Sequence, residues 1–287
     1  MYSVYKKLLL FVLIGCFYAL FQNCLALELV AATNSQSQVL RVASDPNNLP
    51  FSNALGEGFE NKIAELVARE LGRELVYVWH AQRRGFFRET LKENRADLVM
   101  GVPAGFEMAL TTVPYYRSSY VFVALHERSW NLKSLDDSLL RTNRVGVQLI
   151  GDDGANTPPV HALANRGIVT NLVGFTVYGD YAHPNPTADI VKAVASGGID
   201  IGLVWGPVGG YFARQSPVKL DIFPISDSPS DKPLRFEFSI AMGVRKGNKE
   251  FRDQLNSIIA RKSPEIEAIL RQYNIPTLPF TLHKEEH

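Results

Sequence analysis

Short apolar runs alternate with amphipathic helical stretches along almost the whole chain after residue 38. In parallel α/β proteins, buried strands and the helices that connect them produce this alternation of periods. Gly72 stands where the first such helix is expected to end. The first unit is expected to contain a strand at 39–43, a helix at 62–71, a strand at 75–79, a helix around 86–93 and a strand at 97–101.

The pattern starts again after a further apolar strand at residues 120–125. The second unit is expected to contain a strand at 145–149, a helix at 159–166, a strand at 173–178, a helix at 187–195 and a strand at 199–205. A strand at 236–244 then leads back to the first unit, and two helices, 249–261 and 264–273, close the chain. The second α/β unit is therefore nested inside the first.

This nesting predicts two α/β lobes hinged across a central cleft. Lobe 1 is discontinuous, with residues 39–125 and 236–287, and lobe 2 is the insertion at 126–235. Two crossing strands near residues 122–128 and 222–236 are expected to join the lobes. Ligands of open α/β sheets bind beyond the carboxyl ends of the strands, so the cleft is the expected site.

The first residues have the layout of a secretory signal peptide. Lys6 and Lys7 precede an almost uncharged apolar stretch at residues 8–21, which is shorter than the roughly 20 residues that cross a bilayer as a helix. We expect residues 1–26 to be removed by cleavage after Ala26. The mature protein would then be periplasmic and free of the membrane.

Other processing routes stay open at this point. Cleavage after Ala31 or Ala32 is one, a retained membrane anchor is another, and the string LIGC at residues 13–16 resembles a lipoprotein box that would lipidate Cys16. Cys16 and Cys24 are the two cysteines of the chain. Cleavage at the expected site removes both, which excludes disulfides, thiolate catalysis and Cys-ligated metals in the mature protein.

The mature chain is close to neutral. The full sequence has 30 basic and 29 acidic residues, and removal of Lys6 and Lys7 from the 30 leaves 28 basic residues against the same 29 acidic ones. A chain with this balance has no electrostatic attraction for nucleic acid or for an anionic membrane.

Four short strings give the chain a family resemblance over essentially its whole mature length. They are GFENKIA at 58–64, ADLVMG at 96–101, VPYY at 113–116 and VGVQ at 145–148. Their order resembles the family 3 extracellular solute-binding proteins. The resemblance implies the type II periplasmic-binding-protein fold, which agrees with the two hinged lobes expected from the pattern.

Four longer strings carry a narrower resemblance. They are SDPNNLPFSN at 44–53, VPAGFEM at 102–108, IGDDGANTPP at 150–159 and VWGP at 204–207. These look like the MoxJ/MxaJ and XoxJ group, solute-binding-like proteins associated with periplasmic alcohol dehydrogenases that use pyrroloquinoline quinone (PQQ). The resemblance implies a PQQ-dependent alcohol dehydrogenase or its c-type cytochrome as partner. It also implies that PQQ and metal belong to that partner, so this chain needs no cofactor.

The residues of an α-amino-acid clamp are missing. Receptors of family 3 are expected to bind the ligand carboxylate through an Arg before the Pro-Tyr-Tyr motif, since a planar guanidinium matches two carboxylate oxygens. Residues 103–113 contain no Arg or Lys, and their only charge is Glu107. The acid that would hold the ligand ammonium is replaced by Trp205 or Gly206. An amino-acid receptor is therefore disfavoured.

The expected cleft edges, at 45–51, 101–105, 149–157 and 205–209, carry aromatic and neutral polar side chains. Such a pocket suits a small neutral or weakly polar ligand, or an anchoring side chain of another protein. The competing interpretation is that several of these aromatic residues are simply core. We predict a ligand- or partner-binding cleft formed by Asn48, Phe51, Phe106, Tyr115, Tyr116, Gln148, Thr157, Trp205 and Tyr211.

No catalytic or metal-binding pattern stands out, so we do not expect an enzyme. The strongest cluster near one loop is Ser44, Asp45, Glu57 and Glu60, and it lacks a nucleophile–base or cofactor motif. Asp152–Asp153 fits a turn better than a calcium loop, and the histidines, among them His161 and His183, lack the convergence of a zinc site.

Three classes of function remain: an enzyme, a substrate-binding receptor of an ABC importer, and an accessory protein of a PQQ-dependent methanol or alcohol dehydrogenase. The accessory protein is the preferred prediction, because the family resemblance favours it and the neutral aromatic cleft is compatible with docking a segment of another protein. A receptor for a small neutral or weakly polar solute is the alternative.

Overall fold

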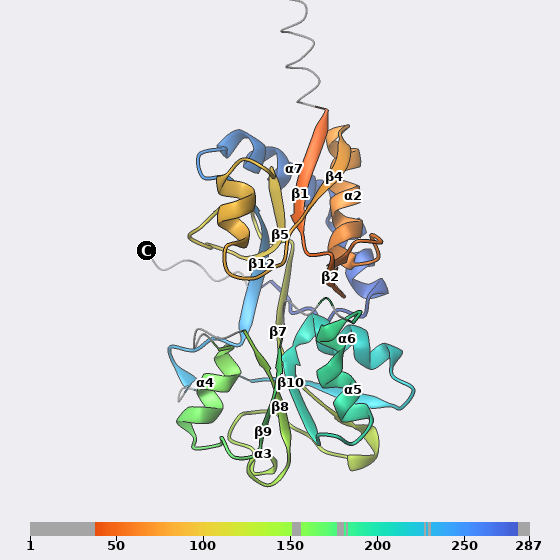
Figure 1. Ribbon diagram of the computed structural model, residues 1–287, viewed down its shortest axis with the longest axis vertical. Coiled ribbons are helices and arrows are strands. Elements are labelled where there is room, and N and C mark those ends of the chain that lie inside the picture. The colour runs from red at the N-terminus through yellow and green to blue at the C-terminus, as the bar shows by residue number, and fades with distance from the viewer. Residues whose placement is uncertain are drawn as a thin grey trace, which may run out of the picture.

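Two α/β halves lie one above the other along the long axis of the molecule (Figure 1). The computed structural model describes residues 38–150, 156–176, 181, 183–226, 228 and 231–280. The leader at 1–26, the pair Asp152–Asp153 and the C-terminal histidines lie outside these residues. The α/β architecture predicted from the alternation of strands and helices is confirmed. Within the described residues, no helix is both long enough and apolar enough to cross a bilayer.

The upper half is a mixed sheet with helices packed against it. Its elements are β1 (Val39–Ser44), β2 (Asn47–Asn48), β3 (Ser52–Asn53), α2 (Phe59–Leu71), β4 (Glu74–Trp79), η1 (Arg88–Lys92), β5 (Leu98–Pro103), β6 (Leu110–Thr111), β12 (Glu237–Val244) and α7 (Lys249–Gln272). β1 lies between β4 and β5, with Val42 opposite Tyr77 on one side and Leu98 on the other. β12 closes the path antiparallel to β5.

The start of α2 is defined by a tight packing of backbone. A side chain at Gly58 would place its Cβ 2.0 Å from the carbonyl oxygen of Phe51, so only glycine fits there. The Asn61 side chain then accepts hydrogen bonds from the Gly58 and Asn53 amides at 3.0 and 3.1 Å. The helix ends at Gly72, as predicted, in the left-handed conformation with φ 63°.

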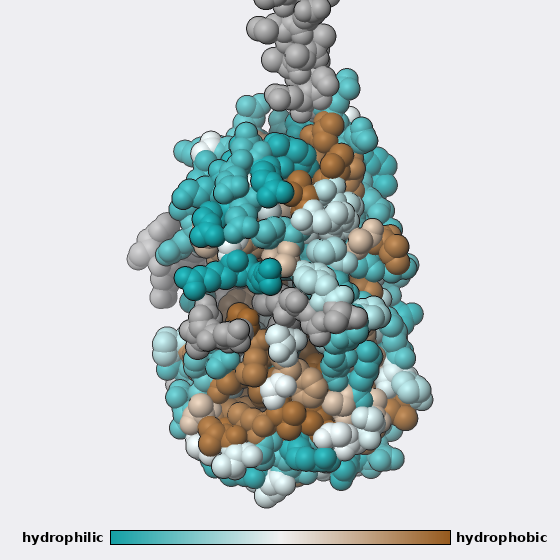
Figure 2. All heavy atoms as spheres, viewed as in Figure 1, coloured by the Kyte–Doolittle hydropathy of each residue, from teal (hydrophilic) through white to brown (hydrophobic). Residues whose placement is uncertain are grey.

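The lower half repeats the arrangement. Its elements are η2 (His126–Arg128), α3 (Leu139–Thr142), β8 (Val145–Leu149), α4 (Pro158–Asn165), β9 (Leu172–Thr176), η3 (Pro186–Ala188), α5 (Asp189–Ala195), β10 (Ile201–Trp205), α6 (Gly206–Gln215) and β11 (Leu220–Pro224). β8 lies between β9 and β10, and all three are parallel. Figure 2 shows apolar residues gathered on the front of this half, whereas hydrophilic residues cover most of the upper half.

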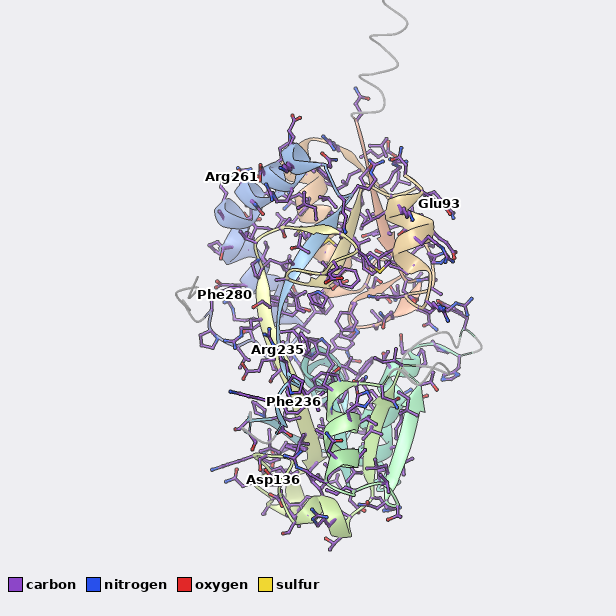
Figure 3. All side chains as sticks on the ribbon, turned by 90° about the vertical axis from the view of Figure 1, so that its left-hand side faces the viewer. Glu93, Asp136, Arg235, Phe236, Arg261 and Phe280 are labelled. Atoms are coloured by element: carbon purple, nitrogen blue, oxygen red, sulfur yellow. The ribbon has the colours of Figure 1, made fainter. Side chains whose placement is uncertain are left out.

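One long strand, β7 (Tyr116–Leu125), belongs to both sheets. Ser119 pairs with Glu237 of β12, whereas the next residue, Tyr120, pairs with Trp205 of β10. The chain therefore crosses between the halves at residues 119–120, which lies before the predicted crossing at 122–128. On the returning segment, Phe236 lies where the two halves meet (Figure 3). The lobe boundaries at 125/126 and 235/236 stay a prediction.

The chain ends in one helix where two were predicted, so this prediction was wrong. α7 runs unbroken through Pro264, although proline removes a hydrogen bond from a helix interior. Pro264 is on the exposed side of α7, whereas Ile258, Ile266 and Leu270 are buried in the same core cluster. Packing of one continuous apolar face therefore outweighs the local cost of the proline.

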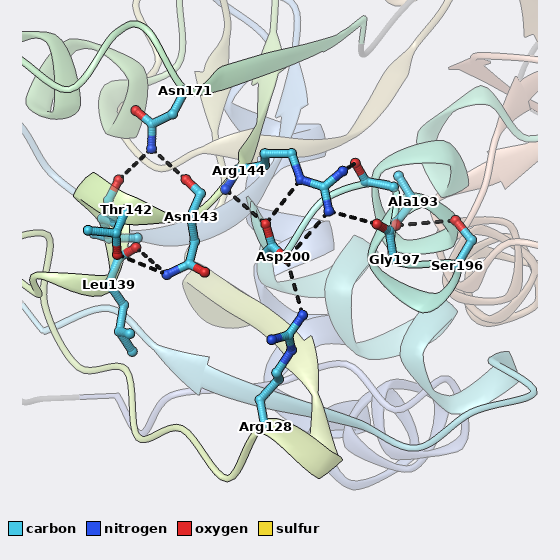
Figure 4. Close-up of polar contacts among 12 residues, drawn as sticks. Arg128, Leu139, Thr142, Asn143, Arg144, Asn171, Ala193, Ser196, Gly197 and Asp200 are labelled. Atoms are coloured by element: carbon cyan, nitrogen blue, oxygen red, sulfur yellow. Dashed lines mark hydrogen bonds and ion pairs between the residues drawn. The ribbon is translucent and has the colours of Figure 1, made fainter.

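A charged network ties the strand ends of the lower half at the side away from the upper half (Figure 4). Arg144 donates to Asp200 at 3.1 Å and to the carbonyl oxygens of Gly197 and Gly198 at 2.8 Å, and Arg128 approaches Asp200 at 3.2 Å. Burial alone would raise the pKa of Asp200, but the hydrogen bonds and charge of Arg144 outweigh it and lower that pKa. This cluster stabilises the fold at a distance from the cleft.

Candidate ligand- or partner-binding cleft

A cavity of about 290 Å³ lies between the two halves. It sits beyond the carboxyl ends of β5, β8 and β10, where ligands of open α/β sheets bind. The residues that line it are Asn48, Phe51, Glu60, Gln82, Phe87, Gly101, Val102, Pro103, Phe106, Tyr116, Tyr120, Gln148, Ile150, Thr157, Trp205, Val208, Phe238 and Ile240. Both halves therefore contribute to one site.

Most of the residues predicted for the cleft meet in this cavity. Those that line it are Asn48, Phe51, Phe106, Tyr116, Gln148, Thr157 and Trp205. Tyr115 and Tyr211 do not belong to the lining. Tyr115 is buried beneath it, with its hydroxyl oxygen 3.2 Å from the Gly101 amide, and Tyr211 stacks on Tyr273 with ring centroids 5.8 Å apart. That the lining residues bind a ligand or partner stays a prediction.

Aromatic rings form much of the cavity wall. The Trp205 ring lies 5.2 Å from the ring of Tyr120 and 5.8 Å from that of Phe238, both in edge-on geometry. On the other side, Phe87 and Phe106 are 4.7 Å apart. Sequence reasoning missed Tyr120, Phe87 and Phe238, because none of them lies just beyond the carboxyl end of a predicted strand.

The neutral polar side chains that line the cavity form hydrogen bonds within the protein. Gln148 accepts a hydrogen bond from the Trp205 amide at 2.8 Å, which fixes the end of β10 against β8. Thr157 precedes α4, but its hydroxyl donates to the Gln148 carbonyl oxygen at 3.0 Å instead of capping that helix. The Asn48 amide nitrogen donates to Gln82 at 2.9 Å. These contacts hold the polar groups of the cavity in defined positions.

Glu60 is the one acidic residue among those lining the cavity, and it is buried. Burial raises its pKa to about 8, although a hydrogen bond from the Tyr115 hydroxyl acts in the opposite direction. Its carboxyl group lies against Gly101, where any Cβ would come within 2.1 Å of Glu60 Oε1. The side chain is therefore predominantly protonated at neutral pH.

The sequence contained a signal for this position. Glu60 falls on the same helical face as Ile63, Ala64 and Val67, all of which are buried in α2. An acid at an apolar position of an amphipathic helix must be buried or break the pattern. The predicted helix begins at residue 62, so Glu60 is expected in a loop cluster instead. In that cluster, Asp45 accepts hydrogen bonds from the Asn47 and Gln82 amides at 2.8 Å, which is a structural use.

The two halves touch directly beside the cavity. Asn47 donates to the His183 carbonyl oxygen and accepts from the Asn185 amide, both at 3.0 Å, and the Thr187 hydroxyl donates to the Leu49 carbonyl oxygen at 2.5 Å. The Tyr181 hydroxyl also lies 3.2 Å from both carboxylate oxygens of Asp45. The conformation is therefore a closed one.

A second set of contacts joins the halves through α6 and the end of α7. Asn274 donates to the Gly210 carbonyl oxygen and Arg214 to that of Gln272, both at 2.8 Å. Gly210 is required for this approach, because a Cβ there would lie 2.2 Å from the Asn274 carbonyl oxygen. The lobes are thus fastened on two sides of the cleft.

Three of the described histidines, His80, His126 and His183, each pair with a different acid. His80 is 3.2 Å from Glu89, and His183 is 3.1 Å from Asp189. Across the described ranges, no three His, Cys, Asp or Glu side chains gather as a metal site would require.

Comparison with known proteins places the chain in a family. Residues 40–275 match the bacterial extracellular solute-binding proteins of family 3. Protein MoxJ of Methylorubrum extorquens is 31% identical over 244 residues, which cover 81% of this chain and 79% of MoxJ. Protein MoxJ of Paracoccus denitrificans is 29% identical and covers 88% of this chain and 94% of its own length.

Two solved structures have the same fold. The periplasmic binding protein XoxJ from Methylobacterium extorquens AM1 is 35% identical with a TM-score of 0.68, covering 84% of this chain and 99% of XoxJ. MxaJ from Methlophaga aminisulfidivorans MPT is 25% identical with a TM-score of 0.73, covering 83% of this chain and all of MxaJ. The chain therefore belongs to the family 3 bacterial extracellular solute-binding proteins, within their MoxJ- and XoxJ-type group.

Proposed function

We propose that the protein is a non-catalytic periplasmic accessory protein of a PQQ-dependent methanol or alcohol dehydrogenase. It acts by protein contact with the dehydrogenase or its c-type cytochrome, during assembly, maturation or electron transfer. Its export depends on the leader at residues 1–26. PQQ, metal and haem belong to the partners, and this chain supplies a binding surface.

The observation that carries the proposal is the combination of the family with the composition of the cavity. The chain is related to MoxJ and XoxJ over most of its length. Among the described residues that line the cavity, none is Arg or Lys. A receptor for amino acids needs a guanidinium or ammonium group to bind the ligand carboxylate. The wall offers aromatic rings instead, and these are common anchors of protein interfaces.

The fastening of the lobes supports the same proposal. In a transport receptor, the ligand supplies much of the free energy that closes the cleft, so that closure reports the bound state. Here the lobes make direct hydrogen bonds through Asn47 and Thr187 on one side and Asn274 on the other. A protein that stays closed presents a constant surface to a partner.

The alternative is a substrate-binding receptor of an ABC importer. One observation favours it: the cavity lies between the lobes and is of the size that holds a small molecule. Its aromatic and amide lining would suit a small neutral or weakly polar solute. The two functions differ in whether a protein or a small molecule is the primary ligand.

The experiment that separates them is affinity capture of the mature tagged protein from the periplasm of its own organism grown on an alcohol. Mass spectrometry of the captured material is expected to identify a quinoprotein dehydrogenase or its cytochrome. The variant Trp205→Ala, which alters the cavity wall, should reduce that recovery. Trp130→Ala is the matched control, because Trp130 packs on the core of the lower half and is not part of the wall.

The opposite result would favour transport. If no dehydrogenase or cytochrome is captured, and denaturing the purified protein releases a small molecule in equal amount, the accessory function is wrong. In that case the same Trp205→Ala variant should lose the small molecule.

A further inference from the structure

Three hydrogen-bond donors at or beneath the cavity wall point to acceptors of the protein itself. The Asn48 amide nitrogen donates to Gln82, the Thr157 hydroxyl donates to the backbone of Gln148, and the Tyr115 hydroxyl donates to Glu60. Each of these donors already has an acceptor within the protein. A ligand in the cavity therefore finds these three donors already occupied.

Two buried side-chain oxygen atoms in residues of the wall have no hydrogen-bond partner among the described residues. They are Glu60 Oε1 and Asn48 Oδ1. Glu60 is 8% exposed and Asn48 is 4% exposed, so bulk water is not at hand to satisfy either atom. A buried acceptor without a donor destabilises the protein, because the group has lost its water and gained no partner. Asn48 Oδ1 therefore lacks a donor in either state of Glu60, and Glu60 Oε1 needs a donor from outside the chain whenever its carboxyl group is ionised.

The rest of the wall favours a donor that carries positive charge. No Arg or Lys is found among the described lining residues, whereas the rings of Tyr116, Tyr120 and Trp205 belong to the wall. Aromatic faces attract cations, and a primary ammonium group offers three donors at one point. An anionic ligand would meet Glu60 with no positive group to hold it.

We propose that the cavity binds a small primary ammonium ion with an apolar body, whose ammonium group contacts the Glu60 carboxyl and whose body lies against the aromatic wall. The inference goes beyond the proposed function and concerns the cavity alone. The volume of about 290 Å³ sets the size of the ligand to one ring or a short alkyl chain.

Binding of this ion has a consequence for protons. With the cavity empty, burial raises the Glu60 pKa to about 8, so the carboxyl holds a proton at pH 7. A bound ammonium favours the carboxylate, and the proton leaves to solvent. The titratable groups that face Glu60 are Tyr115 and Tyr116, and burial raises their pKa values well above the usual range, so neither takes up the proton as a base.

The test is isothermal titration at pH 7 with three probes that share one body: benzylammonium, benzyl alcohol and benzoate. Benzylammonium is expected to bind, benzyl alcohol to bind about tenfold or more weakly, and benzoate to give no measurable binding. Titration in two buffers of different ionisation enthalpy should show release of about one proton for each benzylammonium bound.

Glu60→Gln is the decisive variant, because glutamine is close in shape to the protonated carboxyl and should leave the fold intact. It should weaken benzylammonium about tenfold or more, abolish the proton release and leave benzyl alcohol unchanged. Glu65→Gln is the control, since Glu65 is on the same helix but exposed and paired with Lys62 at 3.1 Å. It should behave as the native protein.

Three results would overturn the inference. They are an absence of benzylammonium binding to the native protein, equal affinities for the ammonium and the alcohol, and an unchanged ammonium affinity in Glu60→Gln. None of these measurements involves a protein partner. A failure of the ammonium-binding inference can therefore be distinguished from a failure of the proposed accessory function.

Discussion

At the residue scale, Glu60 stands out among the described residues as a buried acid without a cationic partner. Its carboxyl lies on the apolar face of α2, against Gly101, with one hydrogen bond from Tyr115. Gly101 has φ 48°, a conformation that other residues rarely adopt, and it leaves no room for a Cβ beside the carboxyl. Glycine at position 101 therefore leaves the space that the Glu60 carboxyl group occupies. Such an arrangement is difficult to explain by stability alone, since a buried acid without a cation is costly.

We predict that Glu60 makes the native protein less stable as pH rises from about 4.5 to about 8. The unfolded side chain loses its proton near its ordinary pKa of 4.5, whereas the folded one holds it until about 8. Between these values the folded state binds more protons than the unfolded state, so the free energy of unfolding falls with pH, by on the order of 1 kcal/mol per unit. Below 4.5 this loss is absent, and above 8 it is complete.

Urea unfolding of the native protein and of Glu60→Gln between pH 5 and pH 8 measures this effect. The variant should gain stability relative to the native protein steadily across that range. Glu65→Gln, with its exposed carboxylate, should show no such trend. A difference between Glu60→Gln and the native protein that does not change with pH would contradict the assignment of the buried proton.

At the scale of elements, α7 demonstrates how tertiary packing overrides a local signal. Pro264 predicts a helix end, but its exposed position lets the buried face on either side continue as one surface. Fully buried side chains such as Leu255 and Ile266 each contribute roughly 1.5–3 kcal/mol, which together exceeds the roughly 3 kcal/mol cost of an interior proline.

Replacing this proline should therefore stabilise the protein. We predict that Pro264→Ala raises the free energy of unfolding by about 1–3 kcal/mol, because alanine restores a helix donor and removes a ring clash. Thermal or urea unfolding is the measurement. Pro279→Ala is the control, since Pro279 is exposed outside any helix, and it should bring no such gain. A loss of stability in Pro264→Ala would mean that α7 needs the proline to pack.

The sequence predicted the elements whose periodicity is simple. The strand at 145–149 was placed at its observed bounds, because a buried parallel strand is a largely apolar run, here interrupted only by Gln148. The first half of β7 was missed, since Arg117, Ser118 and Ser119 do not resemble a strand. Both serines are buried, and Ser118 donates to the Pro276 carbonyl oxygen at 2.5 Å, a contact that no local pattern reveals.

The residues of the cavity were likewise predictable only in part. Phe51, Gln148 and Trp205 could be placed at the cavity because strand ends and their loops face the cleft. Glu60 was not, since its depth depends on how α2 is rotated toward β5. Tyr115 was predicted at the cleft together with Tyr116, but only Tyr116 lines the cavity, because adjacent residues of an extended chain point to opposite sides.

For the whole molecule, the contacts between the lobes determine how the cleft behaves. Asn47 and Thr187 contribute three hydrogen bonds between the halves near the cavity. Each such bond contributes about 1 kcal/mol net, so the protein should be closed without any added ligand. Small-angle X-ray scattering of the ligand-free protein should therefore match the closed arrangement.

The double variant Asn47→Ala with Thr187→Ala should open the molecule. Loss of roughly 3 kcal/mol reduces the ratio of closed to open forms about 150-fold, which should appear as a larger radius of gyration. The matched control is Asn165→Ala with Thr170→Ala, two exposed positions of the lower half. An identical scattering curve for both double variants would mean that other contacts hold the cleft closed.

The central claim is that the protein works by contact with a dehydrogenase, and direct binding tests it. Biolayer interferometry should be performed with the purified mature protein and the purified PQQ-dependent alcohol dehydrogenase, with its cytochrome, of the same organism. We predict saturable binding to one of them, weakened about fivefold or more by Trp205→Ala and unchanged by Trp130→Ala. Absence of saturable binding to both proteins would contradict the account.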